Sequence, residues 1–418
     1  MTKASETREP SSVGKLAVLM VTAFMDMVGI LMIVPLLPFY AKSMGAGGLV
    51  VGLLVSSFSI AQLLMAPVWG RLSDHYGRRP ALIVGMTASA IAYVIFAYAG
   101  SLWLLFLSRI VQGAGGGTVS VIQAYVADAM APKDRAKGLG WLSAATNAGV
   151  ALGPLLGAFA LRWGTPGPGL LAAGLSAVNI GFAWKFLVEA RDPNEASAAR
   201  SQPRVLGRSR QAVLEVVTHP NEPSSRLIWI YAIAIGAFQG STAILALFLA
   251  VRFGVTAKTI GYFFAYIGVL SVFTRAVILG RAVDRFGEAR LSRLGLTLLA
   301  IGLALLPFMY PLSNPVLTYV PLALAVALIP LGTAFTFPCV TSLLSRVVSS
   351  RERGLYMGVQ QTFGGAARVI FPVIYGYLFD RVIELPFLVA AVLVAGTILL
   401  GLRMETYATE TAEKPAAL

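Results

Sequence analysis

The stretch GRLSDHYGRRP, residues 70–80, returns in altered form as GRAVDRFGEAR, residues 280–290. Gly, Arg, Asp, an aromatic residue and Gly stand at the same places in both copies. A second pair of stretches, DRAKGLGW and RERGLYMG, repeats at nearly the same separation. Two matching pairs of polar stretches indicate that the chain consists of two related halves, as in membrane proteins built from internal repeats.

Long apolar runs flank each copy of the loop. Of the 418 residues, 57% are hydrophobic and 12% charged, and the mean hydropathy is +0.77, which excludes an ordinary soluble domain. Each run is close to or above the ~20 residues that a helix needs to cross the hydrocarbon core. We therefore expect an all-α membrane protein with twelve transmembrane helices in two pseudo-symmetric six-helix bundles. The predicted crossings are 16–40, 49–68, 81–99, 102–126, 139–161, 170–187, 227–251, 260–279, 294–310, 316–344, 356–379 and 385–402.

These crossings divide the chain into five segments. We predict a tail (1–15), a first bundle (16–188), a linker (189–226), a second bundle (227–403) and a second tail (404–418). Within the linker, RVLGRSRQAVLEVV could form a short basic amphipathic helix at the lipid surface, or belong to a disordered tether.

The net charge of +14 is distributed as in a membrane protein. Only a few Lys and Arg side chains fall within the predicted spans or in the predicted outer loops, so most lie on one side. This bias predicts cytoplasmic N and C termini and argues against a nucleic-acid partner. The chain has no phosphate-binding loop, no cluster of metal ligands and only two His, so we expect no cofactor, no metal site and no enzymatic activity.

Asp26 is the one acid predicted at mid-membrane depth, and a carboxylate there costs roughly 2.5–3.5 kcal/mol on insertion scales. Arg109 in the fourth crossing lies within about 6 Å of it in depth, from the helical rise of 1.5 Å per residue. Three interpretations stay open: an ion pair, a switch in which protonation of Asp26 releases Arg109, and a static structural pair. Intramembrane charges are usually functional, which favours a role in proton coupling.

Two more cations lie within predicted spans. Arg275 is close to a span end, where it could snorkel to the interface or pair with Asp284. Arg368 lies near mid-depth on a polar stripe with Gln361, where it could contact substrate or bind backbone carbonyls. A largely apolar cavity with a few polar groups suits lipophilic ligands. The candidate residues for its wall are Gln112, Asn147, Gln239, Tyr266, Phe335, Gln361 and Arg368.

In the fifth crossing, Gly149, Gly153 and Gly157 recur every four residues and share one face, which lets a neighbouring helix approach closely. Pro154 removes one backbone hydrogen bond and can bend the helix.

Three motifs together resemble the major facilitator superfamily, and within it the twelve-helix drug:proton antiporters such as the tetracycline exporters. The loop 70–80 is similar to the signature between helices 2 and 3. RIVQGAGGG, residues 109–117, is similar to the helix 4 motif. GLGWLSAATNAGVALGPLLGA, residues 138–158, is similar to the antiporter motif of helix 5, although Ala158 replaces the final Gly.

The resemblance implies a latch that closes the two bundles on the cytoplasmic side. Asp74 would contact the start of helix 11 near Gly354, and Asp284 would contact the start of helix 5 near Gly138. The second latch is the less regular copy, because Glu288 and Ala289 replace an Arg pair. The predicted latch residues are Gly70, Asp74, Gly77, Arg78, Asp284 and Arg285.

The resemblance further implies a monomeric, proton-coupled exporter of lipophilic or amphiphilic small molecules such as drugs, working by alternating access in a bacterial inner membrane or another cell membrane. Its partners would be a small-molecule substrate, protons and the lipid bilayer, and its activity would confer antibiotic resistance. Two alternatives remain: a transporter of lysolipids or anionic metabolites with the same fold, for which Arg368 argues, and a membrane receptor or scaffold that transports nothing.

Overall fold

A computed structural model describes residues 12–130, 134–189, 206–349 and 352–402. These residues form helices and no strands. The elements are α1 (Ser12–Ile33), α2 (Leu37–Ser43), α3 (Gly48–Tyr76), α4 (Arg78–Ala97), α5 (Leu102–Gly115), α6 (Thr118–Ala129), α7 (Arg135–Ala160), η1 (Leu161–Trp163), α8 (Gly167–Phe186), α10 (Leu206–Thr218), α11 (Pro223–Phe253), α12 (Ile260–Phe273), η2 (Thr274–Ile278), α13 (Leu279–Phe286), α14 (Glu288–Leu305), η3 (Leu306–Phe308), α15 (Pro315–Val347), α16 (Arg353–Arg381) and α17 (Leu385–Leu400).

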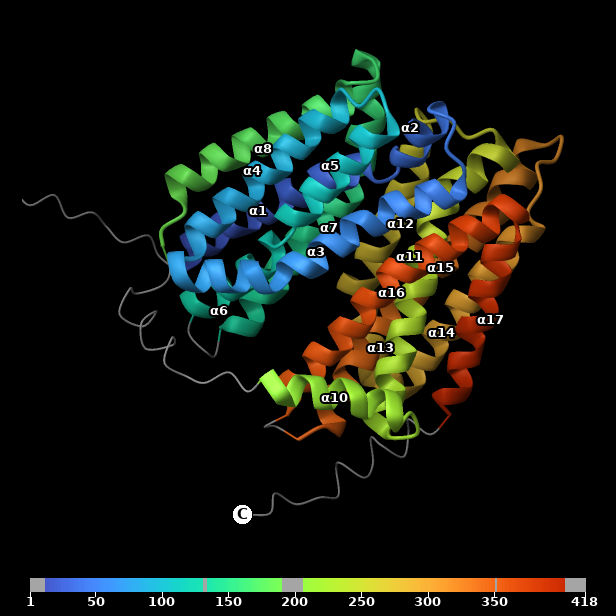
Figure 1. Cartoon of the computed structure of the whole chain (residues 1–418). Coiled ribbons are helices and arrows are strands. Elements are labelled where there is room, and N and C mark those ends of the chain that lie inside the picture. Colours follow the sequence, from blue (N-terminus) through green and yellow to red (C-terminus); the bar gives the residue numbers. More distant parts are fainter. Residues whose placement is uncertain (1–11, 131–133, 190–205, 350–351, 403–418) are drawn as a thin grey trace, which may run out of the picture.

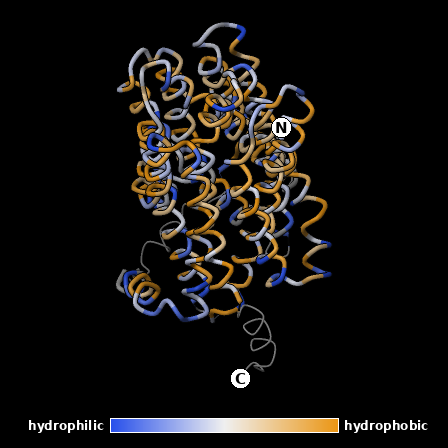
Figure 2. The backbone as a smooth tube through the Cα atoms, turned by 90° about the vertical axis from the view of Figure 1, so that its right-hand side faces the viewer, coloured by the Kyte–Doolittle hydropathy of each residue, from blue (hydrophilic) through white to orange (hydrophobic). Residues whose placement is uncertain are grey.

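Twelve apolar crossings can be assigned to these helices. Ten helical spans in the described residues are long and apolar enough to cross a membrane, and α5 and α17 are shorter apolar helices. The fourth crossing is interrupted, because α5 ends at Gly115 and α6 begins at Thr118. The eighth crossing contains a π-helical segment, η2. Hydrophobic residues cover most of the long helices, and hydrophilic residues gather near helix ends (Figure 2).

The helices group into two bundles (Figure 1). Helices α1 to α8 form the N-terminal bundle and α11 to α17 form the C-terminal bundle, which confirms the predicted fold class. Helix α1 begins at Ser12 and α11 at Pro223, so both start earlier than predicted. The tail 404–418, residues 1–11 and residues 190–205 of the predicted linker lie outside the described residues.

From Leu206 onward, the linker stretch that had two alternatives is helical. Helix α10 lies across one end of the C-terminal bundle (Figure 1). The Trp229 indole donates to the Val216 carbonyl at 3.3 Å, and the Tyr356 hydroxyl donates to the Glu215 carboxylate at 2.9 Å. Helix α10 is therefore attached to the protein, with Ala212 and Val216 buried.

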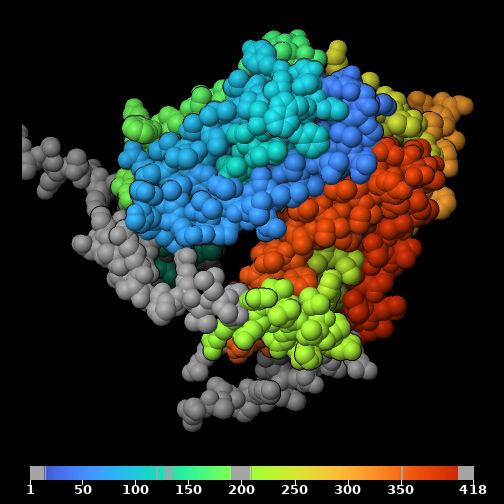
Figure 3. Space-filling view, viewed as in Figure 1, coloured from blue at the N-terminus to red at the C-terminus, as the bar shows by residue number. Residues whose placement is uncertain are grey.

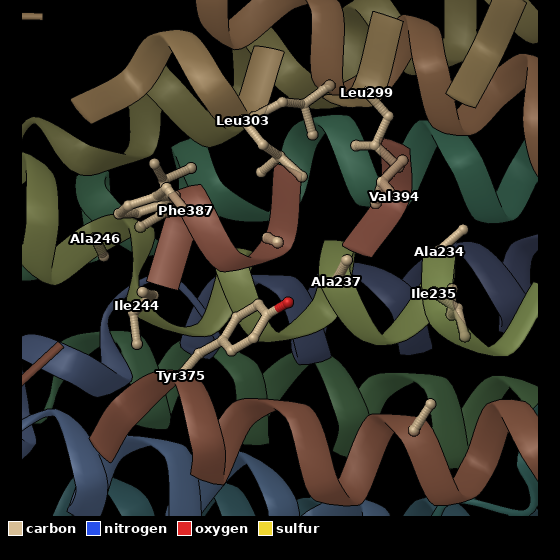
Figure 4. Close-up of a cluster of buried hydrophobic side chains, with 14 of the residues drawn as sticks. Ala234, Ile235, Ala237, Ile244, Ala246, Leu299, Leu303, Tyr375, Phe387 and Val394 are labelled. Atoms are coloured by element: carbon tan, nitrogen blue, oxygen red, sulfur yellow. The ribbon is translucent and has the colours of Figure 1, made fainter. Parts of the chain in front are cut away.

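Helix pairs within each bundle pack closely where glycines meet. The predicted stripe on α7 faces α1: a Cβ added at Gly157 would lie 2.3 Å from the Met32 carbonyl oxygen, and those at Gly149 and Gly153 would also clash with α1. Figure 4 shows the apolar core of the C-terminal bundle, where Tyr375 of α16 lies beside α11. The other residues labelled there are Ala234, Ile235, Ala237, Ile244, Ala246, Leu299, Leu303, Phe387 and Val394.

The two bundles touch through α3 with α16 and α7 with α12. We call the end of the molecule that carries the loops 70–80 and 280–290 the motif end, and the other the opposite end. Near the opposite end a Cβ at Gly52 would lie 2.1 Å from the Pro372 carbonyl oxygen, and one at Gly261 would lie 2.6 Å from the Pro154 carbonyl oxygen. The bundles are therefore tightly closed there.

The bundles are parted at the motif end. A Cβ added at Gly70, Gly140, Gly280 or Gly354 would meet no atom within 4 Å. Figure 3 shows the bundles in contact along α3 and α16, with a hollow between them toward α10. The structure is thus closed at the opposite end and open at the motif end.

Candidate functional site

Asp26 is buried in α1, with 6% of its surface exposed. Its carboxylate accepts a hydrogen bond of 2.9 Å from the Thr118 hydroxyl. Thr118 is the first residue of α6, so the interruption of the fourth crossing places this hydroxyl beside α1. Sequence reasoning did not include Thr118, although it directly follows the helix-breaking run Gly115 to Gly117.

Arg109 does not pair with Asp26 in this structure, so neither the direct ion pair nor the static structural pair is formed here. The Arg109 guanidinium is 2% exposed, and its Nε and Nη2 have no hydrogen-bond partner. No ion pair joins it to an acid of the described residues. A separation in depth derived from chain position says nothing about the direction in which each side chain leaves its helix.

Tyr93 connects the helices of the two charged residues. Its hydroxyl accepts a 3.1 Å hydrogen bond from the Gln112 amide, one turn along α5 from Arg109. Its ring packs against Gly29, one turn along α1 from Asp26, where an added Cβ would lie 3.0 Å from the hydroxyl oxygen. Gln112, a predicted cavity residue, is therefore buried in this cluster. Its Oε1 is unpaired.

The loop 70–80 forms a charge network inside the N-terminal bundle. Arg78 pairs with Asp74 at 3.1 Å and with Asp128, near the end of α6, at 2.9 Å. The Glu189 carboxylate accepts from the Arg78 and Arg79 backbone N–H groups at 2.9 and 3.0 Å and so caps the N-terminus of α4. Gly77, at φ 101°, adopts the left-handed backbone that this turn requires.

The loop 280–290 has the same backbone with different charges. Gly287 has φ 75°. Glu288, the first residue of α14, accepts from Arg346 at 2.8 Å and from the Ser342 hydroxyl at 2.7 Å. Asp284 is exposed and has no ion pair in the part of the chain that the structure describes, and Arg285 lies over the Phe286 ring.

Neither predicted latch is made in this structure. No hydrogen bond joins Asp74 to the Gly354 region or Asp284 to the Gly138 region among the described residues, and the motif end is parted. The latch at this end stays a prediction for a state in which the motif end is closed.

A contact that sequence reasoning missed closes the opposite end. The Asp380 carboxylate, near the end of α16, accepts from the backbone N–H groups of Gly48 and Leu49 at 2.6 and 2.8 Å. It therefore caps the N-terminus of α3 in the other bundle, where a carboxylate is stabilised by the helix dipole. Deeper along the same contact, the Ser56 hydroxyl donates to the Val369 carbonyl at 2.6 Å.

A cavity of about 440 Å³ lies between the bundles and brings together Asn147 and Arg275. The Arg275 guanidinium donates to the Asn147 side-chain oxygen at 3.4 Å. Arg275 does not pair with Asp284, so that expectation is wrong for this structure. Its segment η2 is π-helical, a distortion that is frequent at functional sites.

The other predicted cavity residues lie apart from this cavity. Phe335 is buried against Leu291 and Cys339 inside the C-terminal bundle. The Tyr266 hydroxyl donates to the Ala323 carbonyl at 3.3 Å. Gln239 and Arg368 are half-buried, and the Arg368 Nε has no partner, whereas Gln361 is exposed.

Among the described residues, no group of three His, Cys, Asp or Glu side chains could hold a metal ion.

Comparisons with known proteins place this arrangement in a family. A family model described as Major Facilitator Superfamily matches residues 19–372 and 276–418. The chain is 28% identical over 393 residues to multidrug resistance protein 2 of Bacillus subtilis (strain 168), covering 93% of this chain and 94% of the relative. It is 30% identical over 350 residues to the class C tetracycline resistance protein of Escherichia coli, covering 82% and 84%.

A solved structure has the same fold. The human organic anion transporter MFSD10 (TETRAN) superposes with a TM-score of 0.68 at 23% sequence identity, covering 94% of this chain and 100% of that one. Together with the twelve apolar crossings and the two-bundle architecture, these matches mean that the chain belongs to the major facilitator superfamily.

Proposed function

We propose that this protein is a proton-coupled antiporter that exports lipophilic or amphiphilic small molecules, drugs among them, across a cell membrane. In this proposal it acts as a monomer in a bacterial inner membrane, with both termini in the cytoplasm. The relatives named for multidrug and tetracycline resistance support export of drugs, and such export would confer antibiotic resistance.

Asp26 is the observation that carries the proton coupling. It is a carboxyl in the middle of a membrane helix, held by one hydroxyl and without a cation at ion-pair distance in the described residues. A buried carboxyl in such a site binds or releases its proton when its surroundings change, because the charged form needs water or a partner. Movement of α6 at the Gly116–Gly117 break would withdraw Thr118 and alter those surroundings.

Arg109 is the partner that we propose for the deprotonated carboxyl. Its guanidinium is buried with two unpaired nitrogens, and Tyr93 links its helix to α1. Repacking of the Tyr93 cluster would let Arg109 approach the carboxylate in the other state. Proton binding at Asp26 would then release Arg109, which is the switch interpretation.

The closed opposite end and the parted motif end support alternating access. With the termini in the cytoplasm, the motif end faces the cytoplasm and this state is ready to receive cargo from inside the cell. The bundles would then rock about the α3–α16 and α7–α12 contacts, opening the end that Asp380 closes.

Transport into inverted membrane vesicles tests this function. An imposed pH gradient, acid inside, should drive uptake of members of a panel of dyes, tetracyclines and lysolipids, because the inverted vesicle interior corresponds to the cell exterior. Vesicles without the protein are the control. Uptake of none of the panel would contradict the coupled exporter, and uptake restricted to lysolipids would favour the lipid-transport alternative.

A further inference from the structure

One part of the wall of the cavity between the bundles is polar and the rest is apolar. Helix α1 contributes apolar groups, whereas α6, α7 and η2 contribute hydrogen-bonding groups. Its volume of about 440 Å³ is within the range of pockets for drug-sized ligands. The lining residues are Ala23, Met27, Ile122, Gln123, Leu139, Leu142, Ser143, Thr146, Asn147 and Arg275.

Arg275 is the one charged residue in this wall, and its charge is not balanced there. No acid of the described residues lies within ion-pair distance of it. Its Nε is buried without a hydrogen-bond partner, and its Nη1 is used only for a long bond to the Asn147 oxygen. Arg275 is half-buried, and a guanidinium partly removed from water without a counter-ion is destabilised, so the site favours a ligand that brings a negative charge.

The guanidinium is also aimed at the cavity rather than at lipid. Arg275 belongs to the C-terminal bundle and Asn147 to the N-terminal bundle, so their hydrogen bond crosses the contact between them. The planar fork of an arginine suits the paired oxygens of a carboxylate or sulfonate better than the point charge of a lysine does.

We infer that this cavity binds the acidic group of an amphiphilic anion, with Arg275 as its counter-charge. This inference rests on the proposed function and narrows its substrate class to organic anions. Asn147 orients the guanidinium, the Ser143 hydroxyl, which accepts from the Asn147 amide at 3.3 Å, donates a further hydrogen bond to the acidic group, and the apolar side chains of α1 contact the body of the cargo. Because Ala23 and Met27 flank Asp26 on α1, cargo in the cavity contacts the helix that carries the proton.

Binding of two xanthene dyes to the purified full-length protein tests the inference without a proton gradient. Fluorescein is anionic and rhodamine 123 is cationic. Fluorescence anisotropy should show tighter binding of fluorescein, and Arg275→Gln should weaken it about tenfold or more, the loss expected for one charged hydrogen-bonded contact. Asn147→Asp should also weaken fluorescein binding, because the new carboxylate neutralises Arg275.

Arg281→Gln is the matched control. Arg281 is exposed on α13, bonds the Val277 carbonyl and lies outside the cavity wall, so fluorescein binding should be unchanged. Rhodamine 123 binding and the gel-filtration profile report whether each variant is folded. Stronger binding of rhodamine 123 than of fluorescein to the wild type, no fluorescein binding, or unchanged fluorescein binding by a folded Arg275→Gln variant would overturn the inference. If the dye preferences are as expected but a pH gradient drives no transport, the proposed exporter function is contradicted and the anion site is not.

Discussion

Each end of the contact between α3 and α16 has a carboxylate that can cap a helix N-terminus of the other bundle, and in this structure only one of the two contacts is made. At the opposite end, the Asp380 carboxylate of α16 caps the N-terminus of α3. At the motif end, Asp74 of α3 is predicted to contact the N-terminus of α16, but here it pairs with Arg78 in its own bundle. The comparison suggests that each bundle offers a carboxylate to a helix start of the other, and that only one such contact holds in each state.

The two loop copies each have an ion pair to a neighbouring helix, but the acid and the cation exchange places between the copies. In the N-terminal bundle the first residue of α4, Arg78, is the cation and Asp128 is the acid. In the C-terminal bundle the first residue of α14, Glu288, is the acid and Arg346 is the cation. The acid and the cation of the ion pair are exchanged between the two loops, while both loops keep a glycine of positive φ. The role of this ion pair is therefore to hold the loop to a neighbouring helix.

Of the changes that separate the two ends, loss of the Asp380 cap should have the largest effect, a weaker closure of the opposite end. Asp380→Ala removes two hydrogen bonds to a carboxylate, together worth about 2 kcal/mol or more, and so weakens closure of the opposite end. We expect faster labelling of Ser56→Cys, in a Cys339→Ser background, by a thiol reagent. Ser56 is 1% exposed and lies deeper in the same contact.

Asp380→Asn is the matched control for that experiment, because an amide oxygen can still accept one of the two N–H groups. It should label at a rate between those of the parent and of Asp380→Ala. Equal labelling of Asp380→Ala and the parent would show that the cap does not hold this end closed.

Changes to the Glu288–Arg346 pair should have a smaller effect, on the free energy of unfolding. Glu288→Arg places two cations side by side and should lower the free energy of unfolding by about 1–2 kcal/mol, reduced because Arg346 is 59% exposed. The double variant Glu288→Arg, Arg346→Asp copies the N-terminal arrangement and should recover most of the loss. Thermal unfolding in detergent measures both, and a double variant no more stable than Glu288→Arg would refute the equivalence of the two pairs.

Asp74→Asn should have the smallest effect on stability in this state. Its pair with Arg78 is a partly exposed contact four residues apart, worth about 0.3–0.5 kcal/mol. Ser56→Cys labelling should stay at the parent rate or fall, since Asp74 is predicted to hold the other end. An increase in the labelling rate as large as that caused by Asp380→Ala would contradict the assignment of Asp74 and Asp380 to different ends.

The crossings were predictable because each is a long apolar run, and the two bundles because the loops repeat. The packing role of the α7 glycines Gly149, Gly153 and Gly157 was predictable because a spacing of four places them on one face, where the structure packs α1.

Contacts through space were not predictable. Thr118 is 92 residues from Asp26, and Asp380 is 332 residues from Gly48. Hydropathy fixes how deep a residue lies but not how its helix is rotated against a neighbour, so the Asp26–Thr118 bond was missed and a direct Asp26–Arg109 ion pair remained open. Phe335 illustrates the same limit, because an aromatic side chain in a span can face the bundle core as well as a cavity.

Gradient-driven transport by Asp26→Asn in proteoliposomes is the most direct test of the central claim, that proton coupling lies at Asp26 in the N-terminal bundle. The account predicts that uptake driven by a pH gradient falls to the level of protein-free liposomes, while exchange of substrate without a gradient continues. Asp134→Asn, a change of an exposed acid at the start of α7, should transport like the wild type. Full gradient-driven transport by Asp26→Asn would contradict the account.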